Sequence, residues 1–193
     1  VVPGGRFNEM YGWDSYFIEL GLLKQQRFDL VRHMIDNFIY EITYYGAILN
    51  ANRTYYLQRS QPPFLSEMIL DYYQHVQDKA WLQTTLPALI KLHQYWTSEP
   101  HLVKEIGLSR YYAGGAGATP EESKEYYQKV KQFFSHYAGN EIKIEEFYDK
   151  KHQRLTDKFY IADRTVRESG FDISAKYGPF SVGILDFIPV DLN

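Results

Sequence analysis

Apolar residues recur at helical spacing along most of this 193-residue chain. Over residues 14–45 the spacing predicts either one long helix dented at Gly21 or two helices, and Gly46 is expected to end the run. The same spacing predicts further helices at about residues 63–76, 79–97, 119–137 and 156–168. Only residues 142–147 alternate as a strand does, so the fold class is predicted to be all-α.

Local signals refine two of these helices. Thr119, Pro120 and Glu122 have the order of an N-cap, a first helical residue and a capping-box acid, so they predict a helix start. Pro87 suits the first turn of a helix of its own, which leaves the boundaries within residues 79–97 open. The side of that segment expected to face the core carries Leu82, Leu86, Leu89, Ile90, His93 and Trp96.

Composition narrows the class of protein. Hydrophobic residues make up 45% of the chain, which indicates a globular domain, and cysteine is absent, which excludes disulfides and thiolate metal sites. The net charge of −3 is spread over both signs, so the basic stripe of a nucleic-acid binder is lacking. No apolar run has the length of a membrane span, and no signal peptide is recognisable.

The first segment with candidate chemistry is residues 2–16, which combine paired glycines, a cation, carboxylates and aromatic rings. Arg6 offers a rigid fork of donors that can bridge two neighbouring hydroxyls, and Trp13 offers a face for stacking. Asp14 can accept from sugar hydroxyls or support an arginine. The alternative is a helix start with Asp14 as its cap and Trp13 in the core, and the spacing favours neither.

The second segment is residues 48–63, which contain five strong hydrogen-bonding side chains within twelve positions: Asn50, Asn52, Arg53, Arg59 and Gln61. An amide both donates and accepts, so it matches a hydroxyl that does both. The alternative interpretation is an exposed polar connection, although two arginines among tyrosines and prolines fit that poorly.

Residues 107–121 are rich in glycine, but the Walker lysine is missing and no G-x-G-x-x-G follows a strand, so nucleotide binding is rejected. Either Glu121 or Glu122 is expected to face a pocket, but Glu122 is assigned first to the capping role.

The last segment with candidate chemistry follows the helix predicted at residues 156–168. That helix is expected to end near Gly170 and to project Asp172 from the following turn. Phe171 would partly desolvate this carboxyl and favour the protonated form that a general acid needs, unless Asp172 is a plain turn residue.

Other catalytic chemistries are excluded by inspection. The six histidines show no H-E-x-x-H or other close metal-binding spacing, no G-x-S-x-G elbow occurs, and no thiol is available. Paired carboxylates remain, and glycoside hydrolysis is the main chemistry that uses them. The aromatic content of 17% suits this interpretation, because tyrosine and tryptophan rings stack on sugars, although most of the tyrosines are expected to belong to the core.

Three motifs then carry a family resemblance. Pro3-Gly4-Gly5-Arg6-Phe7-x-Glu9-x-Tyr11-x-Trp13-Asp14-x-Tyr16 resembles a signature of the trehalases, glycoside hydrolase family 37. Residues 50–63 resemble the second hallmark of that family, and Arg167-Glu168-Ser169-Gly170-x-Asp172 resembles the segment with its catalytic acid. Residues 48–53 and 107–121 are similar to the neutral, cytosolic branch.

The resemblance implies an (α/α)6 barrel, of which this chain would form an incomplete part. It also implies inverting hydrolysis of α,α-trehalose to two glucoses, with no cofactor and no metal. Asp172 would be the general acid that protonates the bridging oxygen. The residues implied to line the glucose subsites are Arg6, Trp13, Asp14, Asn50, Arg59, Ser60, Gln61, Glu121, Arg167 and Gly170.

The family's general base is a glutamate nearer the C-terminus, beside a tryptophan-rich signature, and neither occurs in these residues. We therefore expect residues 1–193 to be the N-terminal part of one catalytic domain, inactive alone, from a cytoplasmic parent. Trehalose is the expected partner, nucleic acid and membrane are not, and an exposed half-barrel surface favours self-association. The alternatives are a non-catalytic carbohydrate-binding or regulatory protein on the same fold, or another inverting glucosidase.

Overall fold

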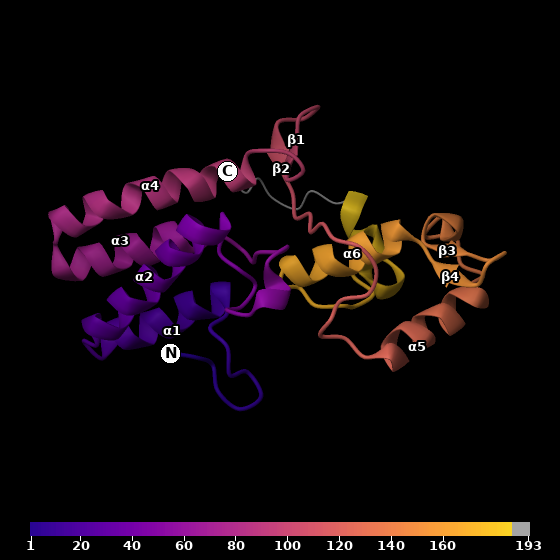
Figure 1. Ribbon diagram of the computed structural model, residues 1–193, viewed down its shortest axis with the longest axis horizontal. Helices are drawn as coiled ribbons and strands as arrows, with labels where there is room; N and C mark the ends of the chain where they lie inside the picture. The colour runs from indigo at the N-terminus through magenta and orange to yellow at the C-terminus, as the bar shows by residue number, and fades with distance from the viewer. Residues whose placement is uncertain (187–193) are drawn as a thin grey trace. The chain divides into compact units, whose positions relative to one another are not determined.

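The computed structural model describes residues 1–186, which form two compact units, residues 1–109 and residues 110–186 (Figure 1). Most of the regular structure in both units is helical, and the described strands are two residues long. The all-α prediction is therefore confirmed.

The first unit is built around α2. Its elements are α1 (Gly12–Lys24), α2 (Phe28–Tyr45), a 3-10 turn (Thr54–Tyr56), α3 (Leu65–Val76), α4 (Lys79–Trp96), and the antiparallel pair β1 (Leu102–Val103) and β2 (Leu108–Ser109). Along α2, Val31, Ile35, Phe38 and Ile42 lie three or four residues apart and are fully buried. Burying each such side chain stabilises the fold by about 1.5–3 kcal/mol, and α1, α3 and α4 all contact this helix.

Residues 14–45 form two helices, but Gly21 does not separate them. Gly21 lies inside α1, and the chain turns at residues 25–27, where Gln26 has a positive φ of 59° and Arg27 N–H donates to the Leu22 carbonyl (2.9 Å). Gly46 ends α2 as predicted: its φ is 94°, and its N–H donates to the Ile42 carbonyl.

Two glycine substitutions are expected to act in opposite directions. Among the described residues, no atom lies within 4 Å of the Cβ that alanine would add at Gly21 or Gly46. Steric clashes therefore do not contribute to the difference in stability expected between the two substitutions. Gly21→Ala should stabilise α1 by about 0.5–1 kcal/mol, whereas Gly46→Ala should cost about 1 kcal/mol because its φ is left-handed. Urea unfolding midpoints measure both changes, and shifts of the same sign would contradict this account.

The predicted core face of α4 is only partly correct: Trp96 is buried and Leu82 and Leu89 are half-buried, but the other predicted residues, Leu86, Ile90 and His93, are exposed. The buried residues are Trp81, Thr85, Ala88, Leu92 and Trp96. Leu86 and Ile90 are 56% and 50% exposed, and Pro87 is accommodated inside the helix rather than starting a new one. The reason is that α4 carries apolar residues on two sides. The Trp81 side faces α2 and α3, because its ring meets Tyr72 edge-on at 4.6 Å and its Nε1 donates to Asp36.

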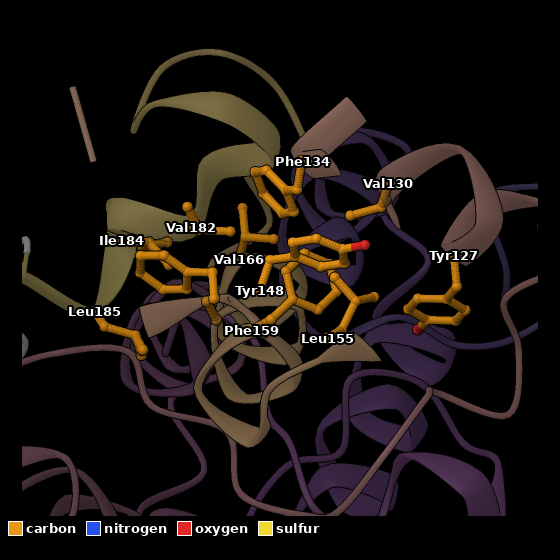
Figure 2. Close-up of a cluster of buried hydrophobic side chains, with 12 residues drawn as sticks. Tyr127, Val130, Phe134, Tyr148, Leu155, Phe159, Val166, Val182, Ile184 and Leu185 are labelled. Carbon is orange, nitrogen blue, oxygen red and sulfur yellow. The ribbon is translucent and has the colours of Figure 1, made fainter. Parts of the chain in front are cut away.

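The second unit has its core between α5, α6 and the last described turn. Its elements are α5 (Lys124–Ser135), a 3-10 turn (Ile144–Glu146), the antiparallel pair β3 (Tyr148–Asp149) and β4 (Arg154–Leu155), α6 (Asp157–Glu168), and a 3-10 segment (Pro179–Asp186). Figure 2 shows Phe134, Phe159, Val166 and Val182 within this core. α6 buries Phe159, Ala162 and Val166 as predicted, and Thr156 caps it by accepting from Phe159 N–H.

Two local predictions in this unit are wrong. α5 begins at Lys124 with Ser123 as its cap, because the Ser123 hydroxyl accepts from Tyr126 N–H (3.1 Å). Thr119 is buried instead, where its N–H and hydroxyl both bond to the Tyr127 hydroxyl. Residues 142–147 are not a strand, since the chain turns at residues 144–146 before pairing begins at β3.

Candidate functional site

In the first unit the two polar segments are joined by hydrogen bonds that involve both backbone and side-chain groups. Met10 N–H donates to Asn52 Oδ1 (2.8 Å), and Asn52 N–H donates to the Met10 carbonyl (3.3 Å). Tyr11 and Ala51 form an isolated β-bridge beside this pair. Candidate groups that lie some forty residues apart in the sequence therefore belong to one patch.

Arg6 lies at the tip of a tight turn. Gly4 and Phe7 exchange two backbone hydrogen bonds (3.1 and 3.0 Å), and Gly4 and Gly5 both have positive φ, which glycine adopts without steric cost. The Arg6 side chain is exposed, with its guanidinium 5.4 Å from the centre of the Phe7 ring. The turn therefore presents the guanidinium to solvent.

Trp13 and Asp14 lie in the first turn of α1. The helix begins at Gly12 with Tyr11 as its N-cap, so the alternative in which Asp14 is the cap is wrong. Trp13 is half-buried, and its N–H donates to Gln61 Oε1 (3.0 Å). A Cβ at Gly12 would come within 3.1 Å of Gln61, so any other residue would require Gln61 to shift by a few tenths of an ångström.

Residues 50–61 are not an exposed polar connection throughout. Asn50, Arg59, Ser60 and Gln61 are all at least nine-tenths buried. Asn50 N–H donates to the Arg59 carbonyl (3.0 Å), and its Nδ2 donates to the Ser60 carbonyl (3.1 Å). The Arg59 guanidinium stacks 4.6 Å from the centre of the Tyr56 ring. These side chains therefore fix the conformation of the loop.

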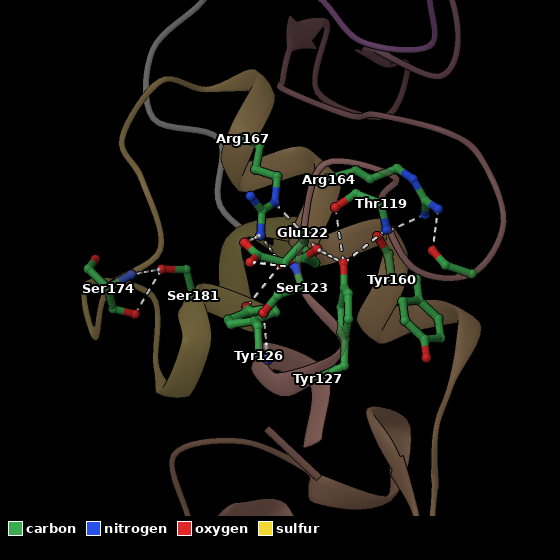
Figure 3. Close-up of polar contacts among 12 residues, drawn as sticks. Thr119, Glu122, Ser123, Tyr126, Tyr127, Tyr160, Arg164, Arg167, Ser174 and Ser181 are labelled. Atoms are coloured by element: carbon green, nitrogen blue, oxygen red, sulfur yellow. Dashed lines mark hydrogen bonds and ion pairs between the residues drawn. The ribbon is translucent and has the colours of Figure 1, made fainter. Parts of the chain in front are cut away.

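In the second unit, Arg167 belongs to a partly buried ionic network (Figure 3). Asp163 Oδ1 accepts from the Tyr126 hydroxyl (3.0 Å) and Arg167 Nη2 (3.2 Å). Asp163 Oδ2 accepts from the Tyr127 hydroxyl (3.0 Å) and Arg167 Nε (3.4 Å). Arg167 Nη2 also donates to Glu122 Oε2 (3.0 Å). The guanidinium is therefore held from two sides.

The electrostatics of this network keep Arg167 charged. Burial by itself lowers the pKa of Arg167, but Asp163 and Glu122 outweigh burial and raise the pKa above its ordinary value. Burial, followed by the charge of Asp163, also raises the pKa of the Tyr126 hydroxyl, which stays protonated as a donor. Asp163 and Tyr126 were missed from the sequence. The only signal was the i, i+4 spacing of Asp163 and Arg167 on a helix.

The two glutamates before α5 have different environments. Glu122 binds Arg167 through Oε2 and accepts from Ser123 N–H through Oε1 (2.9 Å). Its predicted position in a capping box headed by Thr119 is therefore wrong. Glu121 is exposed, and its predicted contact with substrate stays a prediction.

The end of α6 forms the predicted turn. Gly170 has a φ of 72° and Asp172 a φ of 59°, so both are left-handed. This conformation costs most residues about 1–2 kcal/mol and costs aspartate less. Asp172 projects from the turn as expected, but it is exposed and Phe171 is 38% exposed. The expected desolvation of this carboxyl is therefore not produced by the part of the chain that the structure describes.

Comparisons with known proteins address the family. The trehalase family model matches residues 1–193. The cytosolic neutral trehalase of Saccharomyces cerevisiae is 42% identical over the whole chain, which covers 27% of that relative. The cytosolic neutral trehalase of Emericella nidulans is 44% identical over 90% of the chain, which covers 24% of it. The chain thus spans about a quarter of the length of these curated relatives.

A solved structure agrees with the sequence comparison. The neutral trehalase Nth1 from Saccharomyces cerevisiae superposes with a TM-score of 0.79 and 40% identity, over 100% of this chain and 36% of that chain. This likeness confirms the predicted class, a helical chain that forms part of a helical barrel. Within residues 1–186, none of the helices combines the length and apolar character needed to cross a bilayer. The chain belongs to the trehalase family.

Proposed function

We propose that the protein containing this chain hydrolyses α,α-trehalose to two glucose molecules with inversion of configuration. The observation that carries the proposal is the match of the trehalase family model to all 193 residues. Because the chain spans about a quarter of its relatives, we propose that it is the N-terminal part of one catalytic domain. We also propose that the parent is cytosolic, as the names of these relatives state.

The proposed reaction breaks one C–O bond and forms another, assisted by one acid and one base. Asp172 gives its proton to the oxygen that bridges the two glucoses, and the bond between that oxygen and one anomeric carbon breaks. A water molecule attacks that carbon from the opposite face, and its proton passes to a second carboxylate, which the family resemblance assigns to a glutamate outside these residues. No electrons are exchanged, so the proposal includes no cofactor.

The proposed binding groups divide by chemistry. The guanidinium groups of Arg6, Arg59 and Arg167 would donate to sugar hydroxyls, and Trp13 would stack on a sugar face. The rigid hold of Asp163 and Glu122 on Arg167 supports this role, because a donor fixed before binding loses less entropy on binding. The other proposed subsite residues are Asp14, Asn50, Ser60, Gln61, Glu121 and Gly170.

The isolated 193 residues are proposed to be inactive, since the second carboxylate would come from outside them. They are also proposed to self-associate. Phe17, Leu86 and Ile90 are each at least half exposed in the first unit, and large apolar side chains at a surface favour association.

Glucose release from trehalose, maltose and kojibiose tests the function directly. The full-length protein is expected to act on trehalose alone and to release one α-glucose and one β-glucose, because inversion changes only the attacked sugar. Proton NMR within the first minutes distinguishes the two anomers before they interconvert. Two α-glucoses would contradict inversion, a preference for maltose or kojibiose would favour another glucosidase, and binding without turnover would favour a carbohydrate-binding protein. Turnover by the isolated chain would contradict the missing carboxylate.

A further inference from the structure

The first unit contains a cavity of about 280 Å³ between α2 and the residues that follow Leu49. Its lining includes Asn37, Tyr40, Glu41 and Tyr45 from α2, together with Asn52 and Arg53. None of the proposed sugar-binding residues of this unit is among its lining residues. The cavity is therefore built from different side chains than the proposed trehalose site.

Glu41 has an unsatisfied hydrogen-bonding position in this cavity. The residue is only 6% exposed, and its Oε2 accepts from Leu49 N–H (2.9 Å). Its Oε1 accepts no hydrogen bond from the residues that the structure describes. Although most of the residue is buried, Oε1 is not among the described side-chain oxygens that are sealed from solvent without a partner. It therefore opens onto the cavity, where a ligand that brings a donor can reach it.

The charges around Glu41 favour a cationic donor. Arg53 also lines the cavity, but its guanidinium is paired with Glu9, whose Oε1 lies 2.9 Å from Arg53 Nη2. Glu9, Glu41 and Arg53 together therefore leave a negative charge when both carboxyls are ionised. Burial raises the pKa of Glu41 to about 7, with Leu49 N–H acting in the opposite direction, and an approaching cation would keep the carboxyl ionised.

The residues that line the cavity, and its volume, indicate the chemistry and size of the ligand. The Tyr40 and Tyr45 rings lie 6.4 Å apart at 74°, and aromatic faces attract cations. Met10 and Leu49 add buried apolar surface to the lining. The volume is just below the roughly 300–1,000 Å³ of pockets for drug-sized ligands, so the ligand is small.

We propose that this cavity binds a small primary amine. Its ammonium group donates to Glu41 Oε1, and its apolar body packs against Tyr40 and Tyr45. The proposal concerns ligand binding alone, and its outcome is independent of whether trehalose is hydrolysed.

Calorimetric titration of the full-length protein with 2-phenylethylamine at pH 8 tests the proposal, with 2-phenylethanol as the neutral probe of equal size. The amine is expected to bind at least tenfold more tightly than the alcohol. Glu41→Gln keeps an acceptor for Leu49 N–H but removes the charge, so it should weaken amine binding by about 10–100-fold. Tyr45→Leu removes an aromatic contact with the ring of the amine and should weaken binding by about two- to tenfold. Glu67→Gln, on the exposed side of α3, is the matched control and should change nothing.

Three results would overturn the proposal: equal affinity for the amine and the alcohol, no measurable binding of the amine, or unchanged amine affinity in Glu41→Gln. Displacement of the amine by glucose would instead assign the cavity to sugar, which also overturns it. Circular dichroism checks that each variant is folded. If Glu41→Gln does not fold, Tyr45→Leu decides, because that side chain is 51% exposed and its removal spares the core.

Discussion

Asp172→Asn is expected to abolish trehalose hydrolysis by the full-length protein while trehalose binding stays close to its original strength. Asparagine tolerates left-handed backbone as aspartate does, so the φ of 59° at this position survives the substitution. The amide has no acidic proton, and a lost general acid costs about 10²–10⁴-fold in rate. The predicted loss is therefore in kcat, with little change in the dissociation constant.

A second substrate separates the acid role from a structural one. α-Glucosyl fluoride needs no protonation because fluoride leaves unaided, so Asp172→Asn should hydrolyse it far better than it hydrolyses trehalose. Asp157→Asn, on the exposed first turn of α6, is the control and should behave as the unsubstituted protein does. Equal losses on both substrates, or lost trehalose binding with an unchanged residual rate, would remove Asp172 from the acid role.

Helix positions could be predicted where a single apolar face dominates. α2 has one such face, and its buried residues follow the spacing closely. α6 buries its predicted apolar residues, but polar residues on its other sides, such as Arg164 and Glu168, are buried as well. α4 has two apolar faces, and contacts distant in sequence, such as that between Trp81 and Tyr72, decide which side is buried. The choice between Thr119 and Ser123 as a cap was likewise settled by a tertiary contact, since Tyr127 takes both polar groups of Thr119.

The candidate site could be predicted only in part, because contacts between residues distant in the sequence also decide how its side chains are used. The motifs identified both polar segments of the first unit, but not that Asn50 and Gln61 bond to backbone groups. Burial of a charged residue within a helix is harder to predict from the sequence, because most such residues face solvent. Glu19 in α1 is fully buried, neither of its carboxyl oxygens has a partner among the described residues, and burial raises its pKa to about 9. Nothing in the local sequence distinguishes it from a solvent-facing glutamate.

Burial of Asp163 was equally hard to predict from the sequence, and its substitution is expected to cause a large loss of folding stability. Asp163→Ala should lower the free energy of unfolding of the chain by about 2–3 kcal/mol, because it removes the acceptor of the Tyr126 hydroxyl and one of the two carboxylates that hold Arg167. Typical domains are stable by about 5–15 kcal/mol, so the loss is a large share of the total. Urea unfolding measures it, and Asp157→Ala on the same helix, being exposed, is expected to shift the midpoint only slightly.

Asp163→Asn distinguishes a role of Asp163 in folding stability from a role in positioning Arg167. Asparagine fills the same volume and still accepts one hydrogen bond from Tyr126 or Tyr127, so much of the stability should remain. It no longer neutralises Arg167, whose guanidinium would then be drawn toward Glu122 alone. If Arg167 binds substrate, the folded Asp163→Asn protein should lose kcat/KM for trehalose and recover none of it at lower temperature, where a merely unstable variant would recover. Unfolding of Asp163→Ala at the same urea concentration as Asp157→Ala would show instead that the partly buried network contributes nothing to the fold.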